Sequence, residues 1–350
     1  MVFGNLSTGY WLGAAAAAGL HWQEIGRTTL SGTATTINVP YTDKPYVKIL
    51  VSWARETGAT GDPKGQLGDS SADTGSNYAR RLSEGGGADS TNTSVDYFTQ
   101  WATGTGSTIR NFQVISFVNN ASNEKLIQEH GCFAGATGSG SAPYRTENVA
   151  KWANTSAQAG YFSYLGSGTT FSDGAEVVVL GYDPDDTEGG SVWQELADVT
   201  LGSAGDTITT STFTAKKYFM VQTHGIASGN LEAALQVGNG SIDTGSNYAV
   251  RWQVNGTEGT GTSKTSIDTN HTASGNEYIN YFIVNAAAKE KLVIAELIDS
   301  NSAGAGNAPN RVEHTGKWTN TSNQINIVQA KNVGSGSFDT GSSIKVWGFD

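Results

Sequence analysis

Cysteine, proline and charge are all scarce in this 350-residue chain, which has one Cys and six Pro. The single cysteine, Cys132, excludes an intrachain disulfide, and five scattered histidines give no zinc-type spacing. Charged residues make up only 15%, the net charge is -11, and no basic run exceeds Arg80-Arg81 or Lys216-Lys217. Because nucleic acids are bound by clustered basic faces, we expect no nucleic-acid partner.

A long hydrophobic run is also missing. The apolar stretch YWLGAAAAAGL, residues 10–20, is too short to span a membrane, and no Lys or Arg precedes it as in a signal peptide. We therefore expect no membrane insertion and a mature chain rather than a secreted precursor. Residues 1–20 are predicted to form a small-residue arm that lies on its own domain or, as we favour, on a neighbouring subunit.

Glycine and aromatic residues are abundant: 45 Gly, 9 Trp, 13 Tyr and 12 Phe. The aromatic residues supply core material, and clusters of Gly, Ser, Thr and Asn separate short β-rich segments. No long segment outside the arm has a helical period. The pattern predicts an all-β fold, with strands that include residues 46–53, 112–118, 176–182, 278–284 and 292–297.

The chain repeats itself with an offset near 170 residues. SAPYRTENVAKWANTS, residues 141–156, matches NAPNRVEHTGKWTNTS, residues 307–322, at nine of sixteen positions. Further matches keep the same order along the chain. We predict two tandem antiparallel β-sandwiches of jelly-roll type after the N-terminal arm (1–20), with repeat 1 at 21–183, an acidic linker at 184–191 and repeat 2 at 192–350.

DTGSNYA occurs at residues 73–79 and 243–249, and Asp-Thr-Gly-Ser is also the motif of each lobe of a pepsin-like protease. Such a site pairs two aspartates in an apolar setting. Here the flanks are polar and turn-like. A third DTGS, at residues 339–342, aligns with a segment of repeat 1 that lacks the motif. We interpret the motif as a turn braced by Asp, Thr and Ser side chains.

Other candidates for chemistry have simpler structural interpretations. Cys132 follows His130-Gly131, as a nucleophile beside a base would, but a small buried residue at a strand end is the default. Arg145 and Glu147 recur as Arg311 and Glu313, and residues two apart on a strand share a face, which predicts a structural ion pair or a cross-subunit contact. The Asp/Asn-rich loop at residues 69–77 is compatible with calcium but matches no EF-hand. We predict no catalytic, cofactor or metal site; any ligand-binding residues stay unknown.

Asp-Thr-Gly-Ser-Asn-Tyr hairpins occur at residues 73–78 and 243–248, and closing strands follow at 174–182 and 341–349. The second closing strand has the form Gly-Ser-x-Ile-x-Val-x-Gly, and the first has Ala and Val at the places of Ser and Ile. Together they resemble a module of virion structural proteins of tailed phages and related viruses. The module occurs in tail-fibre, tail-tip and head-decoration proteins. The resemblance touches both repeats and carries no catalytic residue. It implies a non-enzymatic virion protein, assembled in the host cytoplasm, whose partners are copies of itself and other virion proteins.

Two alternatives stay open. A carbohydrate-binding adhesin would stack host-surface glycans on exposed aromatic residues, for which Trp101, Trp252 and Trp347 are candidates. The recurring Trp152 and Trp318 are predicted to lie in the core. A double-jelly-roll capsid protein ranks lower, because two repeats this similar would be unusual there.

Overall fold

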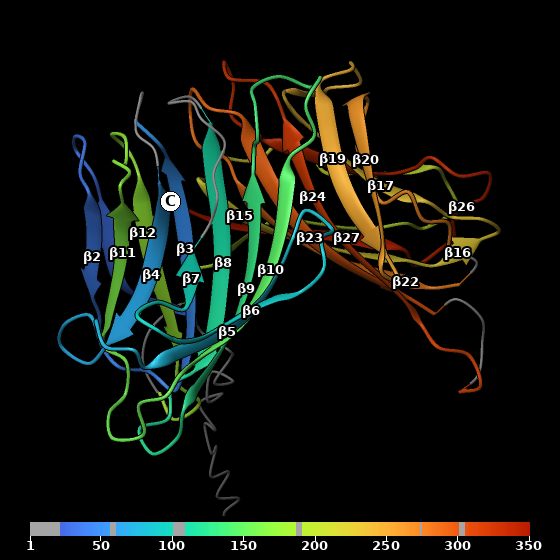
Figure 1. The fold of residues 1–350 in the computed structure, drawn as a ribbon. Helices are drawn as coiled ribbons and strands as arrows, with labels where there is room; N and C mark the ends of the chain where they lie inside the picture. The colour runs from blue at the N-terminus through green and yellow to red at the C-terminus, as the bar shows by residue number, and fades with distance from the viewer. Residues whose placement is uncertain (1–21, 57–60, 101–108, 187–190, 274, 301–304) are drawn as a thin grey trace, which may run out of the picture.

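The chain is all-β (Figure 1). The structure, a computed structural model, describes residues 22–56, 61–100, 109–186, 191–273, 275–300 and 305–350. Within these ranges every regular element is a strand, and the named sheets are antiparallel. The prediction of antiparallel β-sandwiches is therefore confirmed. The predicted arm lies outside the described residues, as do residues 187–190 of the predicted linker.

The first sandwich consists of a long sheet of eight strands and a short sheet of four. In spatial order, the long sheet contains β1 (Gln23–Thr29), β12 (Glu176–Tyr182), β3 (Tyr46–Ala54), β8 (Arg110–Val118), β9 (Lys125–Phe133), β10 (Tyr144–Trp152), β5 (Tyr78–Glu84) and β6 (Ser90–Val95). The short sheet contains β2 (Thr36–Pro40), β11 (Tyr161–Ser167), β4 (Asp62–Gly68) and β7 (Thr99–Gln100).

The second sandwich repeats this plan. Its long sheet contains β13 (Gln194–Thr200), β27 (Ser343–Phe349), β15 (Tyr218–Gly225), β22 (Glu277–Val284), β23 (Lys291–Asp299), β24 (Asn310–Trp318), β19 (Tyr248–Val254) and β20 (Thr257–Lys264). Its short sheet contains β14 (Thr207–Thr209), β25 (Ile327–Asn332), β17 (Ala233–Asn239), β18 (Ser241–Ile242) and β21 (Ile267–Asp268). A separate small sheet joins β16 (Ala227–Ser228) to β26 (Ser337–Phe338).

The strand registers make the two long sheets equivalent residue by residue. Tyr46 pairs with Val118 across β3 and β8, and Tyr218 pairs with Val284 across β15 and β22. In the same way Lys125 faces Trp152, and Lys291 faces Trp318. Each position on one long sheet therefore has a defined counterpart on the other.

The central strands of repeat 1 are apolar on both faces. On β3, Val47, Ile49 and Val51 point into the core between the two sheets of the sandwich, whereas Leu50 points to the opposite, outer face. Strands buried on both sides carry continuous apolar runs instead of an alternating pattern. The sequence of this strand thus reflects a second covering layer, which the other sandwich provides.

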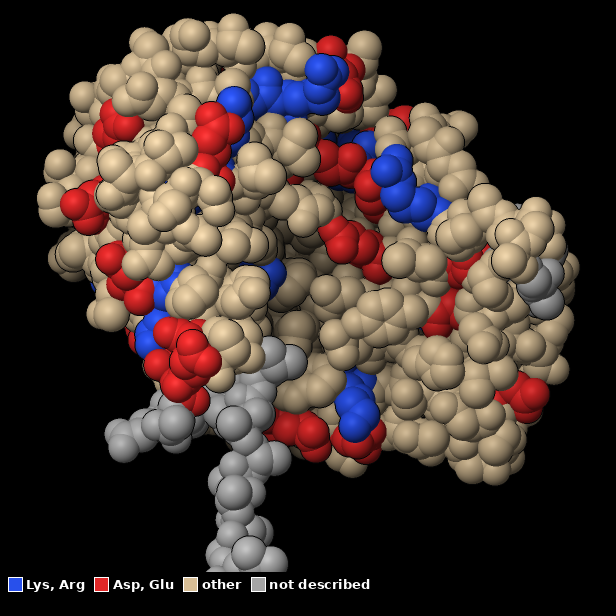
Figure 2. Space-filling view, turned by 90° about the horizontal axis from the view of Figure 1, so that it is seen from below, with Lys and Arg blue, Asp and Glu red and all other residues tan. Residues whose placement is uncertain are grey.

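The two sandwiches pack together through the outer faces of their long sheets. An apolar cluster at this junction includes Leu50, Phe112 and Cys132 of repeat 1 with Leu292 and Phe349 of repeat 2. In Figure 1 the strands β8, β9 and β10 lie next to β23 and β24. Seen from below, the molecule is hollowed between the two repeats, and acidic and basic side chains lie around the hollow (Figure 2).

Candidate functional site

Asp73 of the first DTGSNYA motif braces its own turn. Its carboxylate accepts hydrogen bonds from the backbone N–H of Gly75 at 2.9 Å, from Nδ2 of Asn77 at 2.9 Å and from Nε1 of Trp152 at 2.7 Å. Tyr78 follows Asn77 in the motif and donates from its hydroxyl to the carbonyl of Leu67. The motif thus ties a turn to a buried tryptophan, and no atom of the carboxylate is presented as a base.

Asp243 makes the same set of bonds in repeat 2. It accepts from Gly245 N at 2.8 Å, Asn247 Nδ2 at 2.9 Å and Trp318 Nε1 at 2.7 Å. Partial burial tends to raise the pKa of Asp243, but the bonds from Trp318, Gly245 and Asn247 outweigh it and lower the pKa below its ordinary value. A carboxylate held ionised by its own turn is the opposite of a proton-sharing protease pair, which supports the interpretation as a turn.

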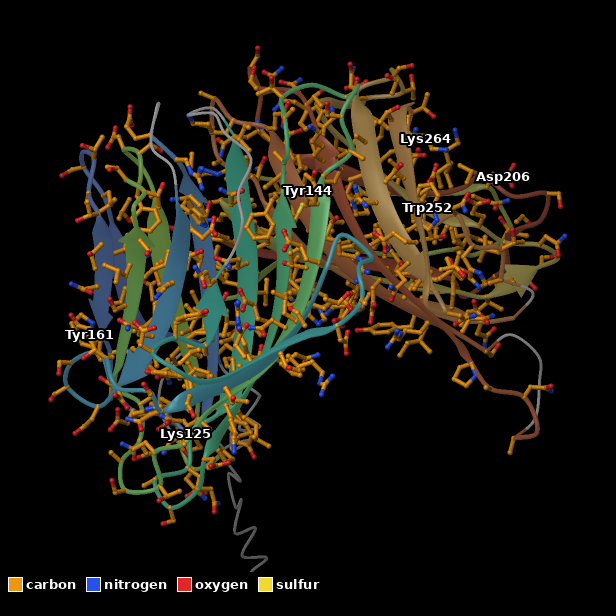
Figure 3. All side chains as sticks on the ribbon, viewed as in Figure 1. Lys125, Tyr144, Tyr161, Asp206, Trp252 and Lys264 are labelled. Carbon is orange, nitrogen blue, oxygen red and sulfur yellow. The ribbon has the colours of Figure 1, made fainter. Side chains whose placement is uncertain are left out.

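Trp152 and Trp318 are fully buried, so the prediction that they belong to the core is confirmed. A buried lysine lies over each indole ring: Lys125 over Trp152 and Lys291 over Trp318, with Nζ 5.1 and 5.7 Å from the ring centroids. Figure 3 shows Lys125 at the lower end of repeat 1. Each ammonium also donates to backbone carbonyls, which compensates its burial.

The Arg–Glu pairs form an ion cluster at the rim of the junction. Arg145 pairs with Glu147 on its own strand, as predicted, and also with Glu258 at 3.0 Å and Glu313 at 3.3 Å in repeat 2. In repeat 2, Arg311 pairs with Glu313 at 3.3 Å. Of the two predicted roles, the structural ion pair is therefore present, and the contacts with Glu258 and Glu313 join two repeats of one chain.

Cys132 lies in the apolar cluster of the junction. It is fully buried, near the end of β9, and burial raises the pKa of its thiol to about 12. His130 points to the other repeat, where its Nδ1 lies 2.6 Å from the Glu296 carboxylate. The structural interpretation of Cys132 is therefore confirmed.

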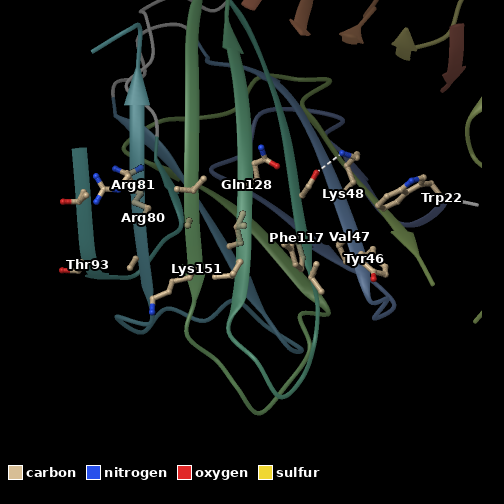
Figure 4. Close-up of a pocket in the computed structure, with 18 residues that line it drawn as sticks. Trp22, Tyr46, Val47, Lys48, Arg80, Arg81, Thr93, Phe117, Gln128 and Lys151 are labelled. Carbon is tan, nitrogen blue, oxygen red and sulfur yellow. Dashed lines mark hydrogen bonds between the residues drawn. The ribbon is translucent and has the colours of Figure 1, made fainter. Parts of the chain in front are cut away.

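The clearest candidate site is an uncovered part of the same outer face. Four apolar side chains on neighbouring strands of repeat 1 are exposed: Tyr46 (42%), Val118 (53%), Leu126 (68%) and Val149 (54%). Together with Lys151 we call them the open face. They line a hollow of about 900 Å³ that runs from β3 across β8, β9 and β10 to β5 (Figure 4). An apolar patch of this kind on a folded protein marks an interaction surface.

Polar groups frame the open face. At one end Lys48 donates to Ser116 Oγ at 2.8 Å and lies 5.9 Å from the ring of Trp22. Gln128 lies in the middle, and Arg81 lies at the other end (Figure 4). Burial lowers the pKa of Lys48 to about 8, although Glu296 opposes this shift. The site offers aliphatic contact in its centre and cationic groups at its ends.

Two of the three tryptophans suggested as sugar platforms, Trp252 and Trp347, lie on different strands of repeat 2. Trp101 lies outside the described residues. Trp252 is half-buried on β19 and packs against the core of repeat 2 (Figure 3). Trp347 is half-buried on β27, opposite Met220. Neither Trp252 nor Trp347 lines the hollow beside the open face.

Sequence reasoning missed the open face. A signal was present, because β8 and β9 place Val118 and Leu126 at positions that a sheet with one solvated face would give to polar residues. Within the described part of the chain, no group of three or more His, Cys, Asp or Glu side chains is arranged to hold a metal ion. None of the described segments forms a helix long and apolar enough to cross a membrane.

Comparisons with known proteins give little more. No family model and no curated protein matches the sequence. Among solved structures, the chain is similar to domains LG4-5 of the mouse laminin alpha1 chain at 8% identity and a TM-score of 0.21, over 94% of this chain and 91% of that one. A human GIVD cytosolic phospholipase A2 gives 8% identity and a TM-score of 0.11, over 79% of this chain and 33% of that one. At such TM-scores neither similarity carries an argument about function.

Proposed function

We propose that this chain is a non-enzymatic structural protein of a virion, such as a capsid-decoration or tail-fibre component, that assembles through protein–protein contacts. The observation that carries the proposal is the open face, where four neighbouring apolar side chains on one sheet are left in solvent. Exposed patches of this kind are retained where a partner covers them. The resemblance of the DTGSNY hairpins and closing strands to virion modules supplies the setting.

The residues that suggested chemistry support a structural role. Asp73 and Asp243 brace turns, Cys132 is buried in the junction, and Arg145 joins the repeats through Glu258 and Glu313. The partners we propose are copies of the chain itself and other virion proteins. A virion protein of this kind is assembled in the host cytoplasm, where the free thiol of Cys132 is tolerated.

Mass spectrometry of purified virus particles tests this function. We expect the chain to be present, at a copy number of hundreds for a shell or decoration protein and of a few for a fibre or tip. Deleting residues 1–20 is expected to leave folded repeats that fail to enter particles. Absence of the full-length chain from particles would refute the proposal.

A carbohydrate-binding adhesin is the second candidate, favoured by one detail of the hollow. Trp22 and Tyr46 lie at one end of it beside Lys48, and a ring next to hydrogen-bonding groups is typical of sugar sites. A glycan array with the full-length chain and with Tyr46→Ala separates the candidates. Saturable glycan binding that Tyr46→Ala abolishes would support the adhesin, and binding to no glycan would support the assembly role.

A further inference from the structure

The open face of repeat 1 has a buried counterpart in repeat 2. The strand registers make Tyr46, Val118, Leu126 and Lys151 equivalent to Tyr218, Val284, Leu292 and Lys317. All four pairs are identical residues, whereas Val149, the fifth member of the open face, corresponds to Thr315. The three apolar members are 42–68% exposed in repeat 1, whereas their counterparts in repeat 2, together with Lys317, are at most 1% exposed. The same surface is therefore covered in one repeat and open in the other.

Repeat 1 itself covers the surface in repeat 2. The ring of Phe112 stacks on Tyr218 with centroids 6.3 Å apart, and Cys132 packs in the same apolar cluster as Leu292. Lys317 donates from Nζ to the carbonyl of Ala134 at 3.2 Å. We call Leu50, Phe112, Val114, Cys132 and Val178 the docking face of repeat 1. The junction thus joins two different surfaces, which makes it a heterologous contact.

The docking face also has a counterpart in repeat 2, which is exposed and more polar, because Leu50 and Val178 correspond to Gln222 and Lys345. Phe112 and Cys132, which pair across β8 and β9, correspond to Tyr278 and Ile298, which pair across β22 and β23. Tyr278 is 42% exposed and Ile298 is 56% exposed. We call this surface the free docking face. Of the eight large apolar side chains that are exposed in the described residues, four lie on the open face and two on the free docking face.

A small cavity of about 130 Å³ lies where these two faces adjoin the junction. It is lined by Val114 of the docking face with Phe282 and Ile294 of repeat 2. The strand registers make Asn280, Ser116 and Gln128 the respective counterparts of these residues. These three polar residues line the same cavity. The open face and the free docking face therefore both border the junction, and both carry polar groups there.

We propose that the open face of repeat 1 binds the free docking face of repeat 2 in a second copy of this chain, so that copies join head to tail through a contact that repeats the arrangement of the junction inside each chain. This inference rests on the proposed assembly function and adds the surfaces and the geometry. Because the contact is heterologous, each copy keeps one unused face at each end of the array. Such contacts build rings where the rotation closes and open filaments where it does not.

The test uses the full-length chain and two charge variants at well-exposed positions, Leu126→Glu on the open face and Ile298→Glu on the free docking face. Sedimentation velocity from micromolar to near-millimolar protein should show concentration-dependent oligomers for the wild type. Each variant should weaken association by about 30-fold or more, because it places an unpaired carboxylate in the centre of the contact. Val333→Glu, at an exposed position outside both faces, is the matched control and should associate like the wild type.

Mixing the two variants identifies the geometry. Leu126→Glu retains an intact free docking face, and Ile298→Glu retains an intact open face. An equimolar mixture should therefore form one-to-one dimers that grow no further. If Ile298→Glu alone associates like the wild type, the open face pairs with another open face and the head-to-tail contact is wrong. Thermal melting close to the wild type confirms that both variants are folded.

Two further outcomes would overturn the inference. A wild-type chain that stays monomeric throughout has no such contact. A full-length monomer that associates only after residues 1–20 are deleted would show that its own arm occupies the open face. If the chain is present in virus particles and either of these results is found, the proposed virion function stands and only the head-to-tail contact is wrong. If the chain is absent from particles, the virion function itself is refuted, whatever the sedimentation experiment shows.

Discussion

Replacing Asp243 by Ala should destabilise repeat 2 by about 2–4 kcal/mol. The substitution removes the acceptor of three donors: Gly245 N at 2.8 Å, Asn247 Nδ2 at 2.9 Å and Trp318 Nε1 at 2.7 Å. The turn donors of Gly245 and Asn247 are exposed and can bond to water instead. The indole N–H belongs to a fully buried ring, and a buried donor without a partner costs about 1–3 kcal/mol. Loss of the charged turn brace adds about 1 kcal/mol.

The assay is urea unfolding of the full-length chain, followed by tryptophan fluorescence and thermal melting. A loss of about 3 kcal/mol corresponds to a Tm lower by about 6–12 °C for a unit of this size. The matched control is Asp339→Ala in the third DTGS. That carboxylate accepts from the exposed N–H of Thr340 at 2.7 Å, and its loss should cost about 0.5 kcal/mol or less.

The pH dependence gives an independent check. The pKa of Asp243 is lower in the folded chain than its ordinary value of 3.8, so its contribution to stability is present above that pH and is lost as pH falls through the folded-state pKa. The difference between wild type and Asp243→Ala should therefore shrink below about pH 4. An Asp243→Ala chain as stable as the wild type at pH 7 would refute the role of this carboxylate as a brace. So would an unchanged effect of Asp243→Ala in a Trp318→Phe background.

Three further predictions concern buried groups. Lys317→Met should lower the free energy of unfolding in urea by about 3 kcal/mol or more, because it removes a donor from the Ala134 carbonyl and leaves the buried Glu290 carboxylate without its cation in the junction. The equivalent Lys151→Met, on the open face, should change this free energy by about 0.5 kcal/mol or less. Burial, with Asp299 and Glu232 nearby, raises the pKa of Glu277 to about 8. Because the folded chain then holds a proton that the unfolded chain releases, stability should fall as pH rises from about 4.5 to 8. Glu277→Gln should abolish this pH dependence, and an unchanged pH dependence in the variant would contradict the assignment to Glu277. In the folded chain at pH 8, Cys132 should react with a thiol reagent at least about 1000-fold more slowly than in the urea-unfolded chain, because its thiol is buried and has a pKa of about 12. Rapid labelling of the folded chain would show that the repeats separate.

Local features of the fold could be predicted from the sequence. The strand segments follow from β-rich runs between Gly/Ser/Asn turns, and the duplication follows from aligned motifs. The same-face pair Arg145 and Glu147 follows from the period of a strand. The link between Asp243 and Trp318 was not predicted, since they lie 75 residues apart. Recurrence of both residues at matching places in the two repeats was the available signal.

Exposure of the open face could not be predicted in this way. Tyr46 and Tyr218 are the same residue at the same position of equivalent strands, yet one is 42% and the other 1% exposed. What differs is the surface that lies on top of each, and this depends on how two folded sandwiches pack. The period of the strands does not encode this asymmetry, because Tyr46 and Tyr218 occupy the same place in it. The sequence difference that accompanies it is Ser116 and Gln128 in repeat 1 at the places of Phe282 and Ile294 in repeat 2.

The asymmetry has a physical consequence for how strongly copies should associate. The junction inside the chain places Phe282 and Ile294 next to Val114, and it forms without loss of translational freedom, because one backbone carries both repeats. Between copies, Ser116, Gln128 and Asn280 replace these three side chains, so the contact has less apolar area to bury and must also offset the entropy of association. The larger apolar residues and their polar counterparts line one cavity at the edge of the fixed junction. A weak contact repeated along an array, and strengthened by each added neighbour, is what a protein needs if it is to associate only at the high local concentration of an assembling particle.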